Sequence, residues 1–262
     1  MKKMRLDTLL VENGFVESQN KAQALIMAGK VRVNGQVVTK AGTPTDLEAG
    51  LHIENDLPYV SRGGLKLMAA LEAFAIDVSG KVCADVGAST GGFTDVLLQR
   101  GAARVYAIDV GYGQLAWKLR QDERVIVMER TNARHLATLP ETVEAVTIDA
   151  SFISLKLILP VVYKWLATPA FVIALIKPQF EAGKNQVGKG GVVRDRAIHH
   201  QVLEKTIDYA LVANFFPLGL INSPITGPAG NHEFLLYLGR QSVWPTISMA
   251  EMIDKCLADL DG

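Results

Sequence analysis

An apolar stretch that runs into a glycine-rich turn limits the fold of this chain more than any other feature. Residues 81–86, KVCADV, have the composition of a buried strand, and the turn that follows them contains Gly87, Gly91 and Gly92. A helical pattern of apolar residues then begins at Phe93. A strand, a glycine turn and a helix in this order form the cofactor-binding start of doubly wound α/β folds. The segment therefore predicts a nucleotide-type cofactor at the turn.

The second predicted strand, residues 104–108, leads directly into an acidic residue, Asp109. An acid about twenty residues beyond the first glycine can accept hydrogen bonds from both ribose hydroxyls of a cofactor. A dinucleotide also needs a second glycine in the turn, so that the backbone can approach its pyrophosphate, and this chain has Ser89 there. S-adenosylmethionine has no phosphate and does not make this demand. The turn therefore favours S-adenosylmethionine and leaves an NAD-dependent oxidoreductase as the alternative.

Further apolar strands alternate with helical patterns along the chain. We expect strands at 125–128, 145–148 and 171–176, and helices near 111–121, 154–166 and 194–213. This alternation predicts a doubly wound, mainly parallel sheet. Because ligands of such sheets bind beyond the carboxyl ends of the strands, the residues at or just past those ends should share one crevice. They are Asp85, Gly87, Asp109, Asn132, Asp149 and Lys177.

The first 40 residues predict a separate small module. Two short helical patterns end at Gly14 and Gly29, and the runs 31–33 and 36–38 flank Asn34-Gly35, the dipeptide best suited to a two-residue hairpin turn. The net charge of the whole chain is zero, yet residues 1–40 hold seven Lys and Arg against three Asp and Glu. This excess of four positive charges could form a basic face for nucleic acid.

The module resembles the S4 RNA-binding domain through Arg5-Leu6-Asp7, Gly14, Ser18, Ala22, Gly29, Val31, Val33, Asn34 and Gly35. Gln19 departs from the pattern, because S4 domains often carry arginine there, and this shifts the expected RNA contacts toward Lys21 and Arg32. A solvated basic surface on a packing module is the alternative. Pro58 disfavours helix at Leu57. We expect an S4 domain at 1–56, a linker at 57–61, a catalytic domain at 62–245 and a helical tail at 246–262.

Two polar residues that follow strands have the chemistry of a base and its partner. Asp149 follows the strand at 145–148, and Lys177 follows the apolar strand at 171–176. A lysine at the end of so apolar a strand is partly desolvated, and such a lysine can deprotonate a hydroxyl group. Taken alone, Lys177 is better explained as a surface lysine whose stem lies along apolar residues.

Five motifs occur in order: SRGG at 61–64 with Lys66, DVGASTGGFTD at 85–95, DASFISL at 149–155, KPQFE at 177–181 and GNHE at 230–233. By these motifs the chain resembles the TlyA family of ribosomal RNA cytidine 2'-O-methyltransferases, from the S4 module to near residue 240. The catalytic domain of that family is similar to the FtsJ-type 2'-O-methyltransferases. The resemblance implies a Rossmann-like class I methyltransferase domain behind a small α+β S4 domain, with S-adenosylmethionine as the methyl donor.

The resemblance also implies a catalytic tetrad, which falls motif by motif on Lys66, Asp149, Lys177 and Glu233. We expect Lys177 to approach or deprotonate the ribose 2'-hydroxyl of a cytidine. Asp149 and Lys66 should fix the charge state of Lys177, and Glu233 should orient the group. Without the resemblance, Lys66 and Glu233 would be explained as solvated charges on a helix and on an edge strand.

The predicted binding residues form two groups. For the cofactor they are Asp85, Gly87, Ala88, Ser89, Gly91, Gly92, Phe93, Asp109, Val110, Asn132 and Asp149. For RNA they are Lys3, Arg5, Lys21, Lys30, Arg32, Arg62, Lys184, Lys189 and Arg194. The segment 181–194 contains four glycines, and we expect a mobile lid over the RNA there, with a plain surface loop as the alternative. No metal site is predicted, because His199, His200 and His232 lack the spacing of zinc ligands.

The expected partner is ribosomal RNA or a ribosomal subunit, in the cytoplasm. The chain starts without a recognisable secretion signal, and its two cysteines are far apart, as in a reducing compartment. The apolar window 157–176 contains Lys164 and two prolines, which favours a buried helix followed by a buried strand over a membrane span. A membrane-acting haemolysin, the label often attached to this family, and an inactive RNA-binding protein are the remaining alternatives. Oligomeric state stays open.

Overall fold

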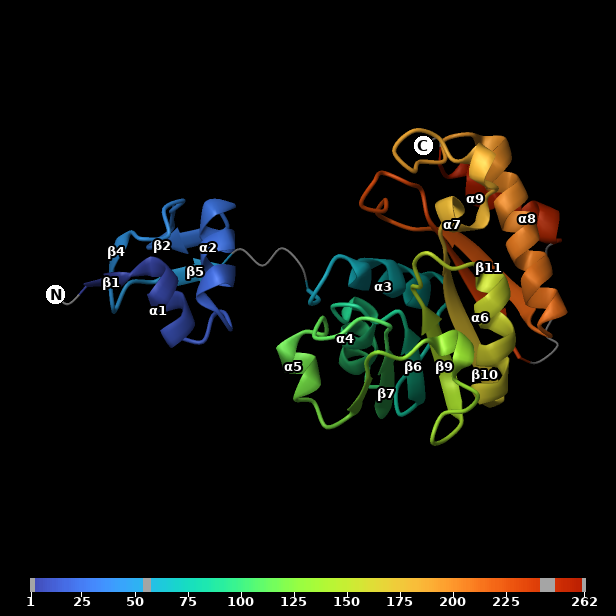
Figure 1. Ribbon diagram of the computed structural model, residues 1–262, viewed down its shortest axis with the longest axis horizontal. Coiled ribbons are helices and arrows are strands. Elements are labelled where there is room, and N and C mark those ends of the chain that lie inside the picture. Colours follow the sequence, from blue (N-terminus) through green and yellow to red (C-terminus); the bar gives the residue numbers. More distant parts are fainter. Residues whose placement is uncertain (1–2, 54–57, 241–247, 261–262) are drawn as a thin grey trace. The chain divides into compact units, whose positions relative to one another are not determined.

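The structure, a computed structural model, describes residues 3–53, 58–240 and 248–260. The chain divides into two compact units, residues 1–58 and 59–262, which Figure 1 shows in blue and in teal to red. The predicted linker, 57–61, and the predicted tail, 246–262, both include residues outside the described ranges.

In residues 3–53 and 58, the described part of the first unit, there are two helices and two small antiparallel sheets. Its elements are β1 (Lys3–Arg5), α1 (Leu6–Glu12), α2 (Gln19–Met27), β2 (Val31–Val33), β3 (Gln36–Val37), β4 (Pro44–Asp46) and β5 (Leu51–Ile53). Strand β1 pairs with β4, and β2 pairs with both β3 and β5. The predicted hairpin is confirmed, because Asn34 and Gly35 have φ values of 50° and 83° between paired strands, as a type I' turn requires. The unit closes over buried Leu6, Leu10 and Ile26.

The second unit is built on a seven-stranded sheet in the order β11-β12-β10-β9-β6-β7-β8. The strands are β6 (Val82–Val86), β7 (Arg104–Ile108), β8 (Val125–Met128), β9 (Val143–Ile148), β10 (Leu166–Ile176), β11 (Phe216–Asn222) and β12 (Phe234–Gly239). Strands β10, β9, β6, β7 and β8 run parallel, whereas β12 is antiparallel to both of its neighbours. The predicted doubly wound, mainly parallel sheet is therefore confirmed.

Helices cover both faces of this sheet (Figure 1). They are α3 (Gly63–Ala73), α4 (Gly92–Gln99), α5 (Trp117–Arg120), α6 (Leu155–Val162), α7 (Pro178–Glu181), α8 (Arg196–Val212) and α9 (Met249–Ala258). Alternate strand residues point to opposite faces, and they divide the core in two. Ala84 and Val86 of β6 belong to the core on the side of α6, α8 and α9, whereas Cys83 of the same strand belongs to the core on the side of α3, α4 and α5.

Two sequence predictions about single elements had different outcomes. The window 157–176 is the expected buried helix followed by a strand, and no helix among the described residues is long and apolar enough to cross a membrane. The helix predicted near 111–121 is wrong except for its last part, since α5 begins only at Trp117. The chain before it turns through Gly113, whose φ of 72° is not helical.

Candidate active site

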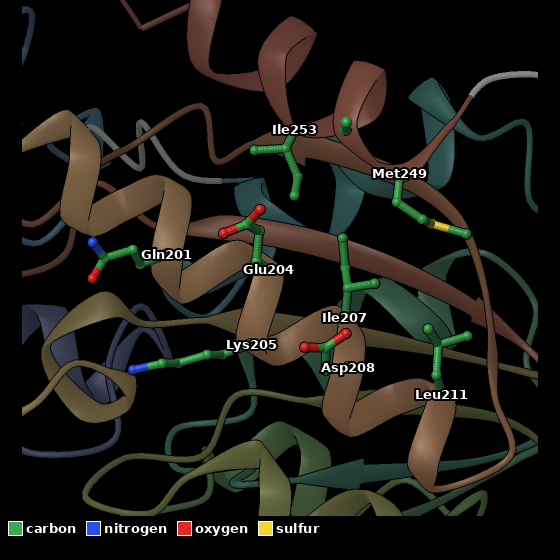
Figure 2. Close-up of a pocket in the computed structure, with 9 residues that line it drawn as sticks. Gln201, Glu204, Lys205, Ile207, Asp208, Leu211, Met249 and Ile253 are labelled. Carbon is green, nitrogen blue, oxygen red and sulfur yellow. The ribbon is translucent and has the colours of Figure 1, made fainter.

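A cavity of about 420 Å³ lies at the carboxyl ends of the parallel strands. Its lining residues are Ser61, Arg62, Gly63, Lys66, Gly87, Ala88, Ser89, Thr90, Gly92, Phe93, Asp149, Ser151, Lys177, Ile225, Thr226, Pro228 and Glu233. A second cavity, of about 470 Å³, lies between α8 and α9, where Glu204 of α8 lies opposite Ile253 of α9 (Figure 2). None of its lining residues belongs to the predicted site. The cavity at the strand ends is therefore the candidate active site.

The four predicted catalytic side chains all line this cavity. Lys66 comes from α3, Asp149 follows β9, Lys177 follows β10, and Glu233 immediately precedes β12. They form two ion pairs: Lys177 Nζ lies 2.5 Å from Asp149 Oδ1, and Lys66 Nζ lies 2.5 Å from Glu233 Oε2. Each lysine therefore has its own carboxylate partner.

Burial distinguishes these groups from surface charges. Lys66 is 7% exposed, Lys177 9% and Glu233 2%, and charged side chains are buried to this extent almost only when they are paired. Lys177 also donates a hydrogen bond of 2.9 Å to Ser151 Oγ. Its contact with Asp149 Oδ1 is an ion pair without hydrogen-bond geometry. Lys177 is thus not a snorkelling surface lysine, and its amine is held inside the cavity.

The glycine turn is pressed against the residue that follows β9. Gly87 has a φ of 84°, and a Cβ atom at this position would lie 2.6 Å from the carbonyl oxygen of Asp149. Only glycine allows this approach at this φ. As a consequence, the same cavity is lined both by the turn after β6 and by the paired side chains of Lys177 and Asp149.

Asp109 lies beside the turn. Its Oδ2 accepts a 2.8 Å hydrogen bond from the Ser89 N–H, and its Oδ1 accepts a 2.7 Å hydrogen bond from the Gly111 N–H. An ionised carboxylate has about four acceptor positions, so Asp109 can still accept two ribose hydroxyls. The remaining acceptor positions of Asp109 suit the ribose of S-adenosylmethionine, and the neighbouring glycine turn suits its methionine part.

Several predicted cofactor residues do not line the cavity. Asp85 is completely buried, where it accepts hydrogen bonds from Thr94 Oγ1 (2.7 Å) and Thr147 Oγ1 (3.0 Å). Burial raises the pKa of Asp85 to about 7. Asp85 thereby connects β6 to α4 and β9, underneath the turn. The other predicted cofactor residues outside the lining are Gly91, Asp109, Val110 and Asn132.

The structure also adds cavity residues that were not predicted. They are Ser61, Gly63, Thr90, Ser151, Ile225, Thr226 and Pro228, and Arg62, predicted for RNA, lines the cavity as well. Just before Ser61 and Gly63, the Val60 N–H donates a 2.8 Å hydrogen bond to Asp95 Oδ2 of α4. Ser151 lies in the motif at 149–155, two residues after Asp149, so the sequence could have predicted it as a site residue. Residues 225–228 are uncharged and lie in none of the five motifs, so nothing in the sequence marked them as site residues.

The predicted RNA residues of the first unit differ in their surroundings. Lys3 and Lys21 are exposed, and Lys21 pairs with Glu17 at 2.8 Å. Arg5 is tied to buried Asp7, which also accepts hydrogen bonds from Gln19 (3.2 Å) and Gln23 (2.9 Å). The guanidinium of Arg5 holds the pKa of Asp7 well below its usual range. Gln19, the departure from the S4 pattern, therefore has an internal partner. Lys30 and Arg32 are half-buried.

In the second unit Arg62, Lys189 and Arg194 are exposed, and the side chain of Lys184 lies outside the described atoms. The segment 181–194 is fastened at its start, because Glu181 accepts hydrogen bonds from the Ser154 hydroxyl (2.6 Å) and the Leu155 N–H (2.7 Å). That it acts as a lid stays a prediction.

Comparisons with known proteins agree with this geometry. The family model for FtsJ-like methyltransferases matches residues 59–240, and the model for the S4 domain matches residues 4–48. YqxC of Bacillus subtilis (strain 168), named as a candidate rRNA methyltransferase, is 52% identical over 248 residues, which are 93% of this chain and 87% of YqxC.

Two further relatives cover nearly the whole chain. The "16S/23S rRNA (cytidine-2'-O)-methyltransferase TlyA" of Mycobacterium tuberculosis is 47% identical over 92% of this chain and 91% of its own length. A solved structure from Streptococcus thermophilus, titled as a candidate hemolysin, has a TM-score of 0.74 and 43% identity, and covers 100% of this chain and 98% of that one. This chain therefore belongs to the TlyA family of FtsJ-like methyltransferases that carry an S4 domain.

Proposed function

We propose that this methyltransferase transfers a methyl group from S-adenosylmethionine to the ribose 2'-hydroxyl of a cytidine in ribosomal RNA. One observation carries the proposal: a buried lysine amine, Lys177 Nζ, is held by Asp149 and Ser151 in the cavity that the glycine turn also lines. The relative from Mycobacterium tuberculosis is named for methylation of this hydroxyl in 16S and 23S rRNA. Membership of the same family extends that activity to this chain.

In this proposal the turn from Gly87 to Phe93 and the carboxylate of Asp109 hold the cofactor. When bound, S-adenosylmethionine supplies a methyl group on a positively charged sulfur. Gly87 keeps the turn close to Asp149, so the bound methyl donor and Lys177 share one confined volume. Confinement of this kind supplies much of the rate enhancement in displacement reactions.

The four polar side chains have separate roles. The neutral amine of Lys177 approaches the ribose hydroxyl and accepts its proton, while the oxygen takes the methyl group and the bond between that methyl group and the cofactor sulfur breaks. Asp149 lies 2.5 Å from that amine and balances the positive charge that it gains. Glu233 pairs with Lys66 at a second point of the cavity wall, so neither side chain is left as an unpaired buried charge. Lys66 then fixes the charge state of Lys177 together with Asp149, and Glu233 orients the group.

Binding of the RNA is assigned to the S4 domain and to the exposed basic residues of the second unit. Arg62 lines the cavity, whereas Lys189 and Arg194 belong to the glycine-rich segment 181–194. We assign residues 1–56 to the S4 domain, 57–61 to the linker, 62–245 to the catalytic domain and 246–262 to a helical tail. The ribosomal subunit is the expected partner, and the cytoplasm the expected compartment.

The test is methyl transfer to ribosomal RNA and to isolated ribosomal subunits with labelled S-adenosylmethionine, followed by mapping of 2'-O-methyl groups. Wild-type protein should label a ribose 2'-oxygen, and Lys177→Met should reduce the rate by about a hundredfold or more, the usual contribution of a general base. Lys164→Met, which removes an exposed lysine, is the matched control and should keep full activity. Undiminished transfer by Lys177→Met would remove Lys177 from the mechanism.

A further inference from the structure

A further cleft, of about 380 Å³, adjoins the candidate active site and shares Ser151, Lys177, Pro228 and Glu233 with it. Residues of the glycine turn after β6 do not line it. Its walls include Val187, Gly190 and Gly191 from the segment 181–194. The cleft therefore reaches Lys177 from a side that the glycine turn after β6 does not occupy.

The wall from the segment 181–194 is a tight turn over residues 188–193. The Gly188 N–H donates a 3.0 Å hydrogen bond to the Val192 carbonyl, and the Gly191 N–H donates one of 3.1 Å to the Gly188 carbonyl. Gly190 and Gly191 have φ values of 79° and 76°. Two consecutive glycines in the left-handed region form a pliable turn, because glycine has the widest choice of backbone conformation. Contacts from outside the turn are needed to hold it in one place.

Asn231 supplies such contacts through both ends of its amide. Its Nδ2 donates a 2.9 Å hydrogen bond to the Gly191 carbonyl, and its Oδ1 accepts a 2.9 Å hydrogen bond from the Val193 N–H. The side chain is nearly completely buried, at 1% exposure. The two bonds also settle the orientation of the amide, because a flipped amide would place donor against donor and acceptor against acceptor.

The same residue is tied to the catalytic strand. Asn231 stands two residues before Glu233, and its carbonyl accepts a 2.9 Å hydrogen bond from the Gly227 N–H. The loop that this bond closes passes directly beside Glu233, since a Cβ atom on Gly227 would lie 2.5 Å from Glu233 Oε1. Asn231 thus connects the turn at 188–193 to the place where β12 delivers Glu233 to the cavity.

We propose that Asn231 is a positioning residue, which holds the turn at 188–193 as the substrate-side wall of the cleft beside Lys177. The inference rests on the proposed function, because the cleft is assigned to the RNA and not to the cofactor. A wall that is already fixed costs the complex less ordering when the RNA binds. Replacement of Asn231 should therefore raise the KM for RNA and should leave the affinity for S-adenosylmethionine unchanged.

The experiment compares Asn231→Ala and Asn231→Asp with wild type, and uses Asn185→Ala, an exposed asparagine of the same segment, as the matched control. At saturating S-adenosylmethionine, both Asn231 variants should raise the KM for RNA about tenfold, which corresponds to the loss of a buried hydrogen bond. Their kcat and their Kd for S-adenosylmethionine, measured by calorimetry, should stay within about twofold of wild type on the same reasoning. The control should match wild type in all three.

Hydrogen exchange of the free protein gives a readout besides activity. The amide of Val193 should exchange faster in Asn231→Ala, because it loses its acceptor, whereas Asn231→Asp keeps an acceptor there and should protect it. Amides of β12 should exchange at the wild-type rate in both variants.

Three outcomes would overturn the assignment. An active wild type with an unchanged RNA KM in both variants refutes the role of Asn231 alone. A parallel loss of thermal stability, kcat and cofactor affinity would show a merely structural residue. A wild type that transfers no methyl group to RNA would refute the proposed function, and the role of Asn231 with it.

Discussion

The buried pair of Lys66 and Glu233 allows a test of whether charge balance holds the active site together. The amine and carboxylate atoms lie 2.5 Å apart, and both side chains are buried. Replacement of one partner leaves the other as an uncompensated buried charge, which typically costs about 3–5 kcal/mol of unfolding free energy. Lys66→Met should therefore destabilise the second unit by that amount.

The double variant Lys66→Met/Glu233→Met should recover most of this loss, because an apolar pair of similar volume is often as stable as a buried ion pair. Urea unfolding followed by tryptophan fluorescence suits the measurement, since Trp165 is buried in the core of the second unit. Arg100→Met is the matched control. It breaks the exposed pair with Glu72 in the same unit, and such pairs contribute only about 0–1 kcal/mol.

The result that would refute this reasoning is a double variant as unstable as Lys66→Met. The cost would then arise from packing around the lysine stem and not from the unpaired charge. A loss below about 1 kcal/mol in Lys66→Met would equally contradict it, because the pair would then behave as a surface pair.

Three further predictions concern the turn and its surroundings. Burial raises the pKa of the Asp85 carboxyl from 3.8 to about 7, so the folded chain binds the carboxyl proton more tightly than the unfolded chain does, and the free energy of unfolding falls as the pH rises between these two pKa values. Asp85→Asn should remove this pH dependence. Urea unfolding at about pH 4.5 and about pH 7.5 should therefore give a smaller difference in the free energy of unfolding for the variant than for wild type. Gly87→Ala should cost about 2 kcal/mol or more, because its φ is 84° and the new Cβ would lie 2.6 Å from the Asp149 carbonyl; a thermal melt at the wild-type temperature would contradict this. Asp109→Ala should weaken binding of S-adenosylmethionine at least about tenfold in calorimetry, as expected when a charged acceptor of hydrogen bonds is lost, and unchanged affinity would remove Asp109 from the cofactor site.

Local patterns predicted the elements of this fold well. The hairpin at Asn34-Gly35 and the order of strand, turn and helix around Gly87 depend on residues close in sequence, and both are present. The helix near 111–121 was wrong because a periodic apolar pattern ignores the glycines that precede α5. Asp85 shows a different limit: its position at a strand end was predicted, but whether its side chain opens to the cavity depends on the threonines that cover it from α4 and β9.

By itself the sequence determined which residues end the strands and which motifs they carry, because hydrophobic periodicity and turn chemistry act over a few residues. Only the tertiary structure decided which charges meet. Lys66 and Glu233 are 167 residues apart, and they pair because β12 inserts antiparallel between β10 and β11, which brings the start of β12 to the carboxyl ends of the parallel strands. Strand order is set by the burial of both sheet faces at once, a property of the whole core that no local pattern contains.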